Sequence, residues 1–154
     1  MINIKNTIRA VFAIPLLGFS LTGLPDVITL KDHNGVYMVP ITINDSITVN
    51  GILDTGSFEM FIPFDVIETL KQSESITMDN ITEDALYRMA DGSIKTTERI
   101  NIERIKIGKT MFHNISAIVG PNNSEILIGQ NLLQAFNYYS IDNKRKILIL
   151  NNTP

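Results

Sequence analysis

Short apolar runs separated by turn residues occupy most of the chain after residue 25. Many of these runs are rich in Val, Ile, Thr and Tyr, which favours β-strands. The run over 99–107 alternates apolar and polar positions, with one break in the alternation at Arg104. The strands that the pattern predicts are 27–30, 36–43, 47–49, 52–54, 87–90, 93–97, 99–107, 111–119, 126–128, 138–141 and 146–150. Closely spaced strands of this kind predict a small closed or sandwiched all-β fold.

Short turns connect the expected strands. Asn34-Gly35 and Asp91-Gly92 are dipeptides that favour tight two-residue hairpin turns, because both residues adopt positive φ readily. The stretch Asn44-Asp45-Ser46 and the pair Asn50-Gly51 predict further turns, at which one strand ends and the next begins. The Asp91-Gly92 turn therefore predicts a β-hairpin in the middle of the chain.

Two short helices and one loop are expected among the strands. Apolar residues recur at helical spacing between Pro63 and Leu70, and a proline suits the first turn of a helix. A second short helix is expected over residues 130–136. The polar stretch 73–84 predicts a loop. The fold is therefore expected to be all-β with one or two short helices.

The N-terminal segment differs from the rest of the chain. Lys5 and Arg9 precede an uncharged, mainly apolar run from residue 10 to residue 25. A basic head followed by a short apolar run is typical of a secretory signal, and this run is shorter than the ~20 residues of a membrane-spanning helix. We predict that residues 1–25 are a signal peptide or membrane anchor and that 26–154 form the domain, periplasmic, extracellular or anchored facing outward. The alternatives are a segment that belongs to the folded core and a cytoplasmic protein.

Composition excludes several classes of chemistry. The chain has no cysteine, which rules out disulfides, a thiol nucleophile and a thiolate metal site. Its two histidines, His33 and His113, lie in no metal-ligand spacing and are expected at the surface without a chemical role. The net charge of −3 gives no electrostatic support for nucleic-acid binding. We therefore expect no metal, no cofactor and no nucleic-acid partner.

The candidate chemistry lies in the four residues Asp54, Thr55, Gly56 and Ser57. They stand between two apolar runs, 51–53 and 60–63. A carboxylate placed between hydrophobic runs is costly to bury unless it is paired or used in a reaction. Much later in the chain comes a second apolar run that ends in glycine and leads into the second expected helix. It consists of Ile126, Leu127, Ile128 and Gly129.

In this order the two segments resemble the two signatures of retropepsin-like aspartic proteases. The first signature of that family is apolar-apolar-Asp-Thr/Ser-Gly-Ala/Ser, and the second is apolar-apolar-Gly at the start of a helix. The resemblance covers the chain from Ile28 to Leu150. The closing hairpin after the helix resembles the cellular and bacterial single-domain branch of the family more than its viral members.

The resemblance implies a fold, an assembly and a site. The fold would be a small closed β-barrel-like acid protease fold, active as a two-fold homodimer in which each protomer supplies one Asp54 to a catalytic dyad. Thr55 would hold the two catalytic loops together across the two-fold axis, and Gly56 would permit close approach of the backbones. The Ser57 hydroxyl would bond the outer oxygen of Asp54. A substrate-binding flap would be formed by Met89, Ala90, Asp91, Gly92 and Ser93.

Other interpretations of the same residues remain open at this point. The favoured function is an aspartic endopeptidase acting on peptide or protein substrates, and the alternative is a catalytically silent peptide-binding or dimerisation module on the same fold. A third hypothesis is an unrelated small β-barrel, membrane-tethered, in which Asp-Thr-Gly is an ordinary turn. Tyr87 and Met89 could line a peptide site or pack on a sheet face. The side chains of Phe58, Phe61 and Phe64 are expected in the core.

Overall fold

The structure is a computed structural model that describes residues 25–89 and 91–151. Residues 1–24 of the predicted signal or anchor segment lie outside these residues. Two α-helices, α1 (Phe64–Gln72) and α2 (Gln130–Leu133), and a 3-10 helix (Met78–Asn80) accompany the strands. The strands are β1 (Asp26–Thr29), β2 (Lys31–His33), β3 (Val36–Ile43), β4 (Ile47–Leu53), β5 (Met60–Pro63), β6 (Ile81–Arg88), β7 (Ile94–Ile107), β8 (Thr110–Gly120), β9 (Ile126–Ile128), β10 (Tyr138–Asp142) and β11 (Ile147–Asn151).

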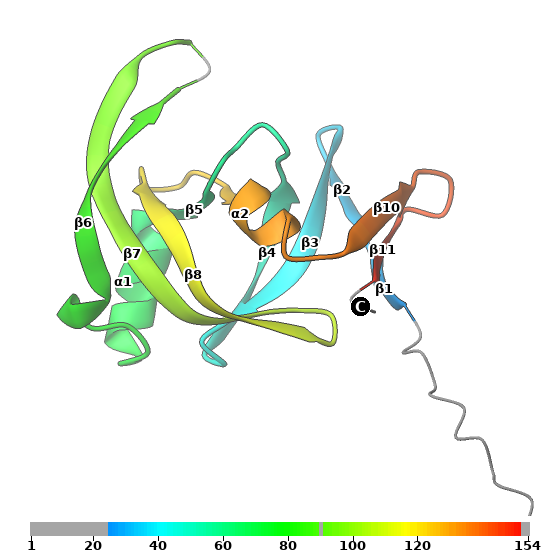
Figure 1. The fold of residues 1–154 in the computed structure, drawn as a ribbon, viewed down its shortest axis with the longest axis horizontal. Coiled ribbons are helices and arrows are strands. Elements are labelled where there is room, and N and C mark those ends of the chain that lie inside the picture. The colour runs from blue at the N-terminus through cyan, green and yellow to red at the C-terminus, as the bar shows by residue number, and fades with distance from the viewer. Residues whose placement is uncertain (1–24, 90, 152–154) are drawn as a thin grey trace, which may run out of the picture.

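Most of the strands belong to one large sheet that closes on itself. Its order is β2-β3-β4-β9-β5-β8-β7-β6, and an additional pairing of β3 with β7 completes the closure. The strands β1, β11 and β10 form a separate three-stranded sheet, which lies on the side of the molecule opposite β6 and α1 (Figure 1). The predicted all-β, closed, barrel-like fold with short helices is therefore confirmed.

The interior of the closed sheet is filled by aliphatic side chains from almost every strand. Ile41 and Ile43 of β3, Ile62 of β5 and Ile128 of β9 have no exposed surface, and Leu132 of α2 packs against the same cluster. Full burial of one such side chain contributes about 1.5–3 kcal/mol. These buried side chains form one continuous core.

Two parallel strand pairs determine where the candidate site lies. β4 runs parallel to β9, with Leu53 opposite Ile128, and β5 runs parallel to β8. β9 lies between β4 and β5 in the sheet. Since β4 ends immediately before Asp54 and β9 ends immediately before Gly129, this arrangement brings the two sequence signatures to the same edge of the barrel.

The structure corrects two sequence expectations about where strands begin and end. Asn50-Gly51 is not a turn, because β4 continues through both residues, with Gly51 opposite Val39 on one side and Ile126 on the other. A Cβ on Gly51 would lie 3.0–3.1 Å from the side chains of Ile126 and Ile128, so the glycine serves close packing of two strands. The stretch 73–84 is not wholly a loop, since it contains the 3-10 helix and the first half of β6.

The two tight turns expected from Asx-Gly pairs have different geometries. Asn34 and Gly35 both have positive φ, 52° and 85°, as the predicted two-residue turn between β2 and β3 requires. In the β6–β7 hairpin Gly92 has φ 85°. The Gly92 N–H donates to the Met89 carbonyl, so the turn begins one residue earlier than the dipeptide predicts.

The helices and the alternation break are close to their predicted positions. Pro63 precedes α1 as its N-terminal cap residue, and α1 extends two residues beyond Leu70. α2 is shorter than expected, ending at Leu133. The side-chain alternation of β7 changes at residues 103 and 104, so that Ile102 and Ile105 both face the core. No helix within residues 25–89 and 91–151 is long and apolar enough to cross a membrane.

Candidate active site

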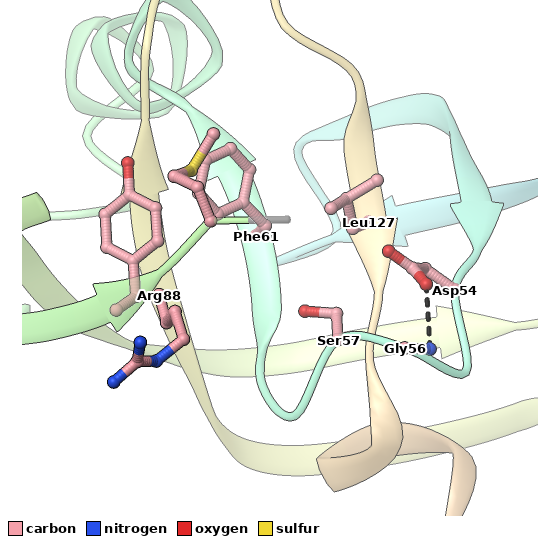
Figure 2. Close-up of a pocket in the computed structure, with 8 residues that line it drawn as sticks. Asp54, Gly56, Ser57, Phe61, Arg88 and Leu127 are labelled. Atoms are coloured by element: carbon pink, nitrogen blue, oxygen red, sulfur yellow. Dashed lines mark hydrogen bonds between the residues drawn. The ribbon is translucent and has the colours of Figure 1, made fainter. Parts of the chain in front are cut away.

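Asp54 stands at the first position after β4, at the edge of the barrel. Its backbone N–H donates to the carbonyl of Ile128 at 3.2 Å, which continues the β4–β9 pairing by one residue. Its carboxylate accepts a hydrogen bond from the Gly56 N–H at 2.9 Å (Figure 2). The residue is only half-buried, and it lines a pocket.

The residues after Asp54 form a tight loop around its carboxyl group. A Cβ on Gly56 would lie 3.2 Å from the Asp54 Oδ1 atom, closer than ordinary van der Waals contact. The Ser57 N–H donates to the Asp54 carbonyl at 3.3 Å. The Ser57 hydroxyl, however, donates to the carbonyl of Glu59 at 2.7 Å and not to the Asp54 carboxylate, contrary to the sequence expectation. Thr55 is exposed, and its predicted contact across a two-fold axis remains a prediction.

The residues that follow the second signature bind this loop through backbone hydrogen bonds. Gly129 is the N-terminal cap of α2, and the first N–H groups of that helix donate to the loop: Gln130 to the Ser57 carbonyl and Asn131 to the Phe58 carbonyl, both at 2.9 Å. The first turn of a helix has N–H groups without intrahelical partners, and the loop carbonyls satisfy them here. A Cβ on Gly129 would lie 2.3 Å from the Glu59 carbonyl oxygen, so only glycine permits this approach.

A pocket of about 460 Å³ opens beside the Asp54 carboxylate. Its apolar walls are Phe61, Tyr87, Met89 and Leu127, and Arg88 also lines it. Tyr87, Arg88 and Met89 belong to the arm of the β6–β7 hairpin, which extends away from the barrel (Figure 1). The hairpin that the sequence predicts as a flap therefore contributes a wall to the same pocket as Asp54. Of the predicted flap residues, Ala90 lies outside the described residues.

Two of the three phenylalanines after the Asp-Thr-Gly segment are not in the core. Phe58 is 76% exposed and Phe64 is 41% exposed, which contradicts the sequence expectation for both. Phe61 is partly buried, lines the pocket and contacts the Tyr87 ring edge-on, with centroids 5.8 Å apart. The apolar pattern could not separate these cases, because an apolar residue in a loop can serve a core, a groove or an interface equally well.

An ion-pair network that the sequence analysis did not identify lies directly behind the loop. Glu59 receives two hydrogen bonds from the Arg99 guanidinium at 3.0 Å, one to each carboxylate oxygen, and a third from the Ser116 hydroxyl at 2.7 Å. Only 12% of the Glu59 side chain and 25% of the Arg99 side chain are exposed. Arg99 also bonds Glu83, which is directly opposite on β6. The hydrogen bonds to Glu59 raise the pKa of Arg99 above its usual value.

The network connects the Asp54 loop to the base of the hairpin. Glu59 ends the loop, whereas Arg99 and Glu83 face each other on the two hairpin strands. Nothing in the local sequence marks the pair, because Glu59 and Arg99 are 40 residues apart. Within residues 25–89 and 91–151 no cluster of three or more side chains suited to a metal ion is found.

The fold is that of the retropepsin-like aspartic proteases. The chain belongs to the family described as "gag-polyprotein putative aspartyl protease", whose sequence model matches residues 39–135. In fold it is similar to the crystal structure of a retropepsin-like aspartic protease from Rickettsia conorii. That comparison has a TM-score of 0.62 and 24% sequence identity, over 82% of this chain and 89% of the other. No curated protein matches the chain.

Proposed function

We propose that the chain is an aspartic endopeptidase whose catalytic centre forms when two copies each contribute one Asp54. The observation that carries this proposal is the position of Asp54. The loop that follows it is fixed by hydrogen bonds from α2, and its side chain lines a pocket whose other wall comes from the β6–β7 hairpin. One Asp-Thr-Gly occurs in the chain. A two-fold homodimer, the commonest symmetric assembly, would supply the second carboxylate.

The proposed chemistry needs two carboxyl groups that share one proton. At a separation of about 3 Å both cannot be ionised, so one remains neutral and the other charged. The ionised carboxylate takes a proton from an attacking water, and the neutral carboxyl gives a proton to the carbonyl oxygen of the peptide bond. The proton of the dyad is a property of the pair and belongs to neither Asp54 separately.

The proposed substrate is an extended peptide segment that lies between the hairpin and Asp54. Main-chain groups of an extended peptide can pair with exposed strand edges, while alternate side chains enter pockets. The walls formed by Phe61, Leu127 and Met89 favour apolar side chains near the scissile bond. A digest of a peptide library with the purified protein, at acidic and at neutral pH, tests this proposal. Stable binding of peptides without any cleavage would favour the catalytically silent module instead.

Specific activity should fall when the enzyme is diluted. The proposed centre exists only in the dimer, so at protomer concentrations below the dimer dissociation constant the rate should become second order in protomer. Initial rates of peptide cleavage over a dilution series, together with light scattering at the same concentrations, provide the measurement. A monomer that retains constant specific activity would contradict the shared dyad.

We further propose that the segment 1–25 directs export or anchors the domain on the outer side of a membrane. The basis is the position of Lys5 and Arg9 before an uncharged run that extends to Pro25. Expression of the full chain with a C-terminal tag, followed by cell fractionation, should place the tag outside the cytoplasm. A Lys5→Glu/Arg9→Glu variant, which removes the basic head, should remain in the cytoplasm. Identical distribution of both proteins would contradict the export proposal.

A further inference from the structure

The charged side chains around the candidate site are few, and most of them are already used. The pocket beside Asp54 adjoins a second pocket of about 330 Å³, which is lined in addition by Phe58 and Glu59. The residues that line both pockets are Gly56, Ser57, Phe61, Tyr87 and Arg88. The charged residues that line the two pockets are Asp54, Glu59 and Arg88. Asp54 is assigned to the reaction. Each of the other two charges therefore needs an explanation.

The charge of Glu59 is compensated within the protein. Its carboxylate accepts two hydrogen bonds from the Arg99 guanidinium and one from the Ser116 hydroxyl. A carboxylate with three charge-assisted or hydroxyl bonds and 12% exposure presents little negative charge to a ligand. Glu59 is thus part of the wall and is not a binding group.

Arg88 has no such compensation. Its side chain makes no hydrogen bond and no ion pair with any residue in the described ranges 25–89 and 91–151, and it is exposed. Figure 2 shows Arg88 across the pocket from Asp54, with Ser57 and Phe61 between them, so Arg88 does not neutralise the catalytic carboxylate. A guanidinium in this place presents a fork of donors that fits a carboxylate with two parallel hydrogen bonds.

We infer that Arg88 is a specificity-determining residue that selects peptides with an acidic side chain, Asp or Glu, close to the apolar residues at the scissile bond. The inference rests on the proposed function and names the substrate class of the same site. Since Arg88 lies across the pocket from Asp54, the carboxylate belongs to a residue one or more positions away from the bond that is cut. The preference should be modest, because the guanidinium is exposed to solvent.

The test uses pairs of peptides that differ only by Glu or Gln at one position, scanned over four positions on each side of the scissile bond. The wild-type enzyme should cleave one Glu peptide roughly two- to fivefold faster in kcat/KM than its Gln partner, and added salt should reduce the ratio. Arg88→Gln should bring the ratio of the two kcat/KM values to one, and Arg88→Glu should invert it.

Lys95→Gln is the matched control. Lys95 is an exposed cation on β7, directly opposite Tyr87 of β6 in the strand register. It lines a different pocket, which does not include Asp54. This variant should keep the wild-type ratio. A wild-type ratio of one at every position, or a ratio that survives in Arg88→Gln, would overturn the inference while leaving the protease proposal intact. Failure of the wild-type enzyme to cleave either peptide of any pair would overturn the proposed function, and this inference with it.

Discussion

Replacement of Asp54 by Asn should reduce peptide cleavage by roughly a thousandfold or more while leaving the fold intact. The amide keeps the shape of the side chain and can still accept the Gly56 N–H bond, which is 2.9 Å long in the structure. It cannot hold or release the shared proton, so both the activation of water and the protonation of the carbonyl are lost. Initial cleavage rates of the wild-type and variant proteins, measured at the same protein concentration, provide the comparison.

Asp79→Asn is a matched control for this experiment. Asp79 is an exposed residue of the 3-10 helix, and the same chemical change there should leave the rate unchanged. The circular dichroism spectrum and the light-scattering mass of the Asp54 variant should equal those of the wild-type protein. Turnover close to the wild-type rate in Asp54→Asn would exclude the aspartic protease mechanism, whatever the fold.

Replacement of Arg99 by Met should destabilise the protein by about 3 kcal/mol, at the lower end of the range for breaking a buried ion pair. Glu59 would lose both guanidinium bonds and would keep only the Ser116 hydroxyl as a partner for a side chain that is 12% exposed. Activity should fall as well, since Glu59 closes the loop that carries Asp54. Urea unfolding at fixed protein concentration, so that dimerisation is held constant, measures the change in free energy.

The double variant Glu59→Gln/Arg99→Met separates the two causes of this loss. It removes the unpaired charge, so it should be more stable than Arg99→Met alone, because much of the cost of breaking a buried pair is the remaining charge. Arg99→Lys keeps a positive charge without the two parallel bonds and should lie between the wild-type protein and Arg99→Met. If the changes in unfolding free energy of Glu59→Gln and Arg99→Met add up to that of the double variant, Glu59 and Arg99 are not coupled as the structure indicates.

Features that depend on a few neighbouring residues could be predicted from the chain alone. The apolar pair before Asp-Thr-Gly identified Asp54 as the candidate catalytic residue, and the second apolar-apolar-Gly run identified the start of α2. The Asn34-Gly35 turn was predicted correctly because its geometry depends on the φ preferences of those two residues. The alternation in β7 was predicted with its break, because burial on one face imposes a period of two.

The failures occur where a non-local contact overrides a local preference. Asn50-Gly51 has the composition of a turn, yet Gly51 pairs with strands on both sides and its missing Cβ admits the side chain of Ile128. The beginning of β6 is polar because β6 is the last strand of the sheet and pairs with β7 alone, so its sequence resembles a loop. Phe58 was assigned to the core because an apolar residue has no local mark that distinguishes a groove from an interior.

The sequence by itself determined the all-β class, the candidate carboxylate Asp54 and the presence of the β6–β7 hairpin. Strand-forming runs, the Asp-Thr-Gly segment and the Asp91-Gly92 turn can each be recognised within a short window of residues. Only the tertiary structure decided which distant groups share the site. The parallel pairing of β4 with β9 places Asp54 beside Ile128, the pairing of Glu59 with Arg99 joins the loop to the hairpin base, and Arg88 lines the same pocket as Asp54. These relations depend on strand register and order, which are set by burial across the whole barrel and not by any single stretch of chain.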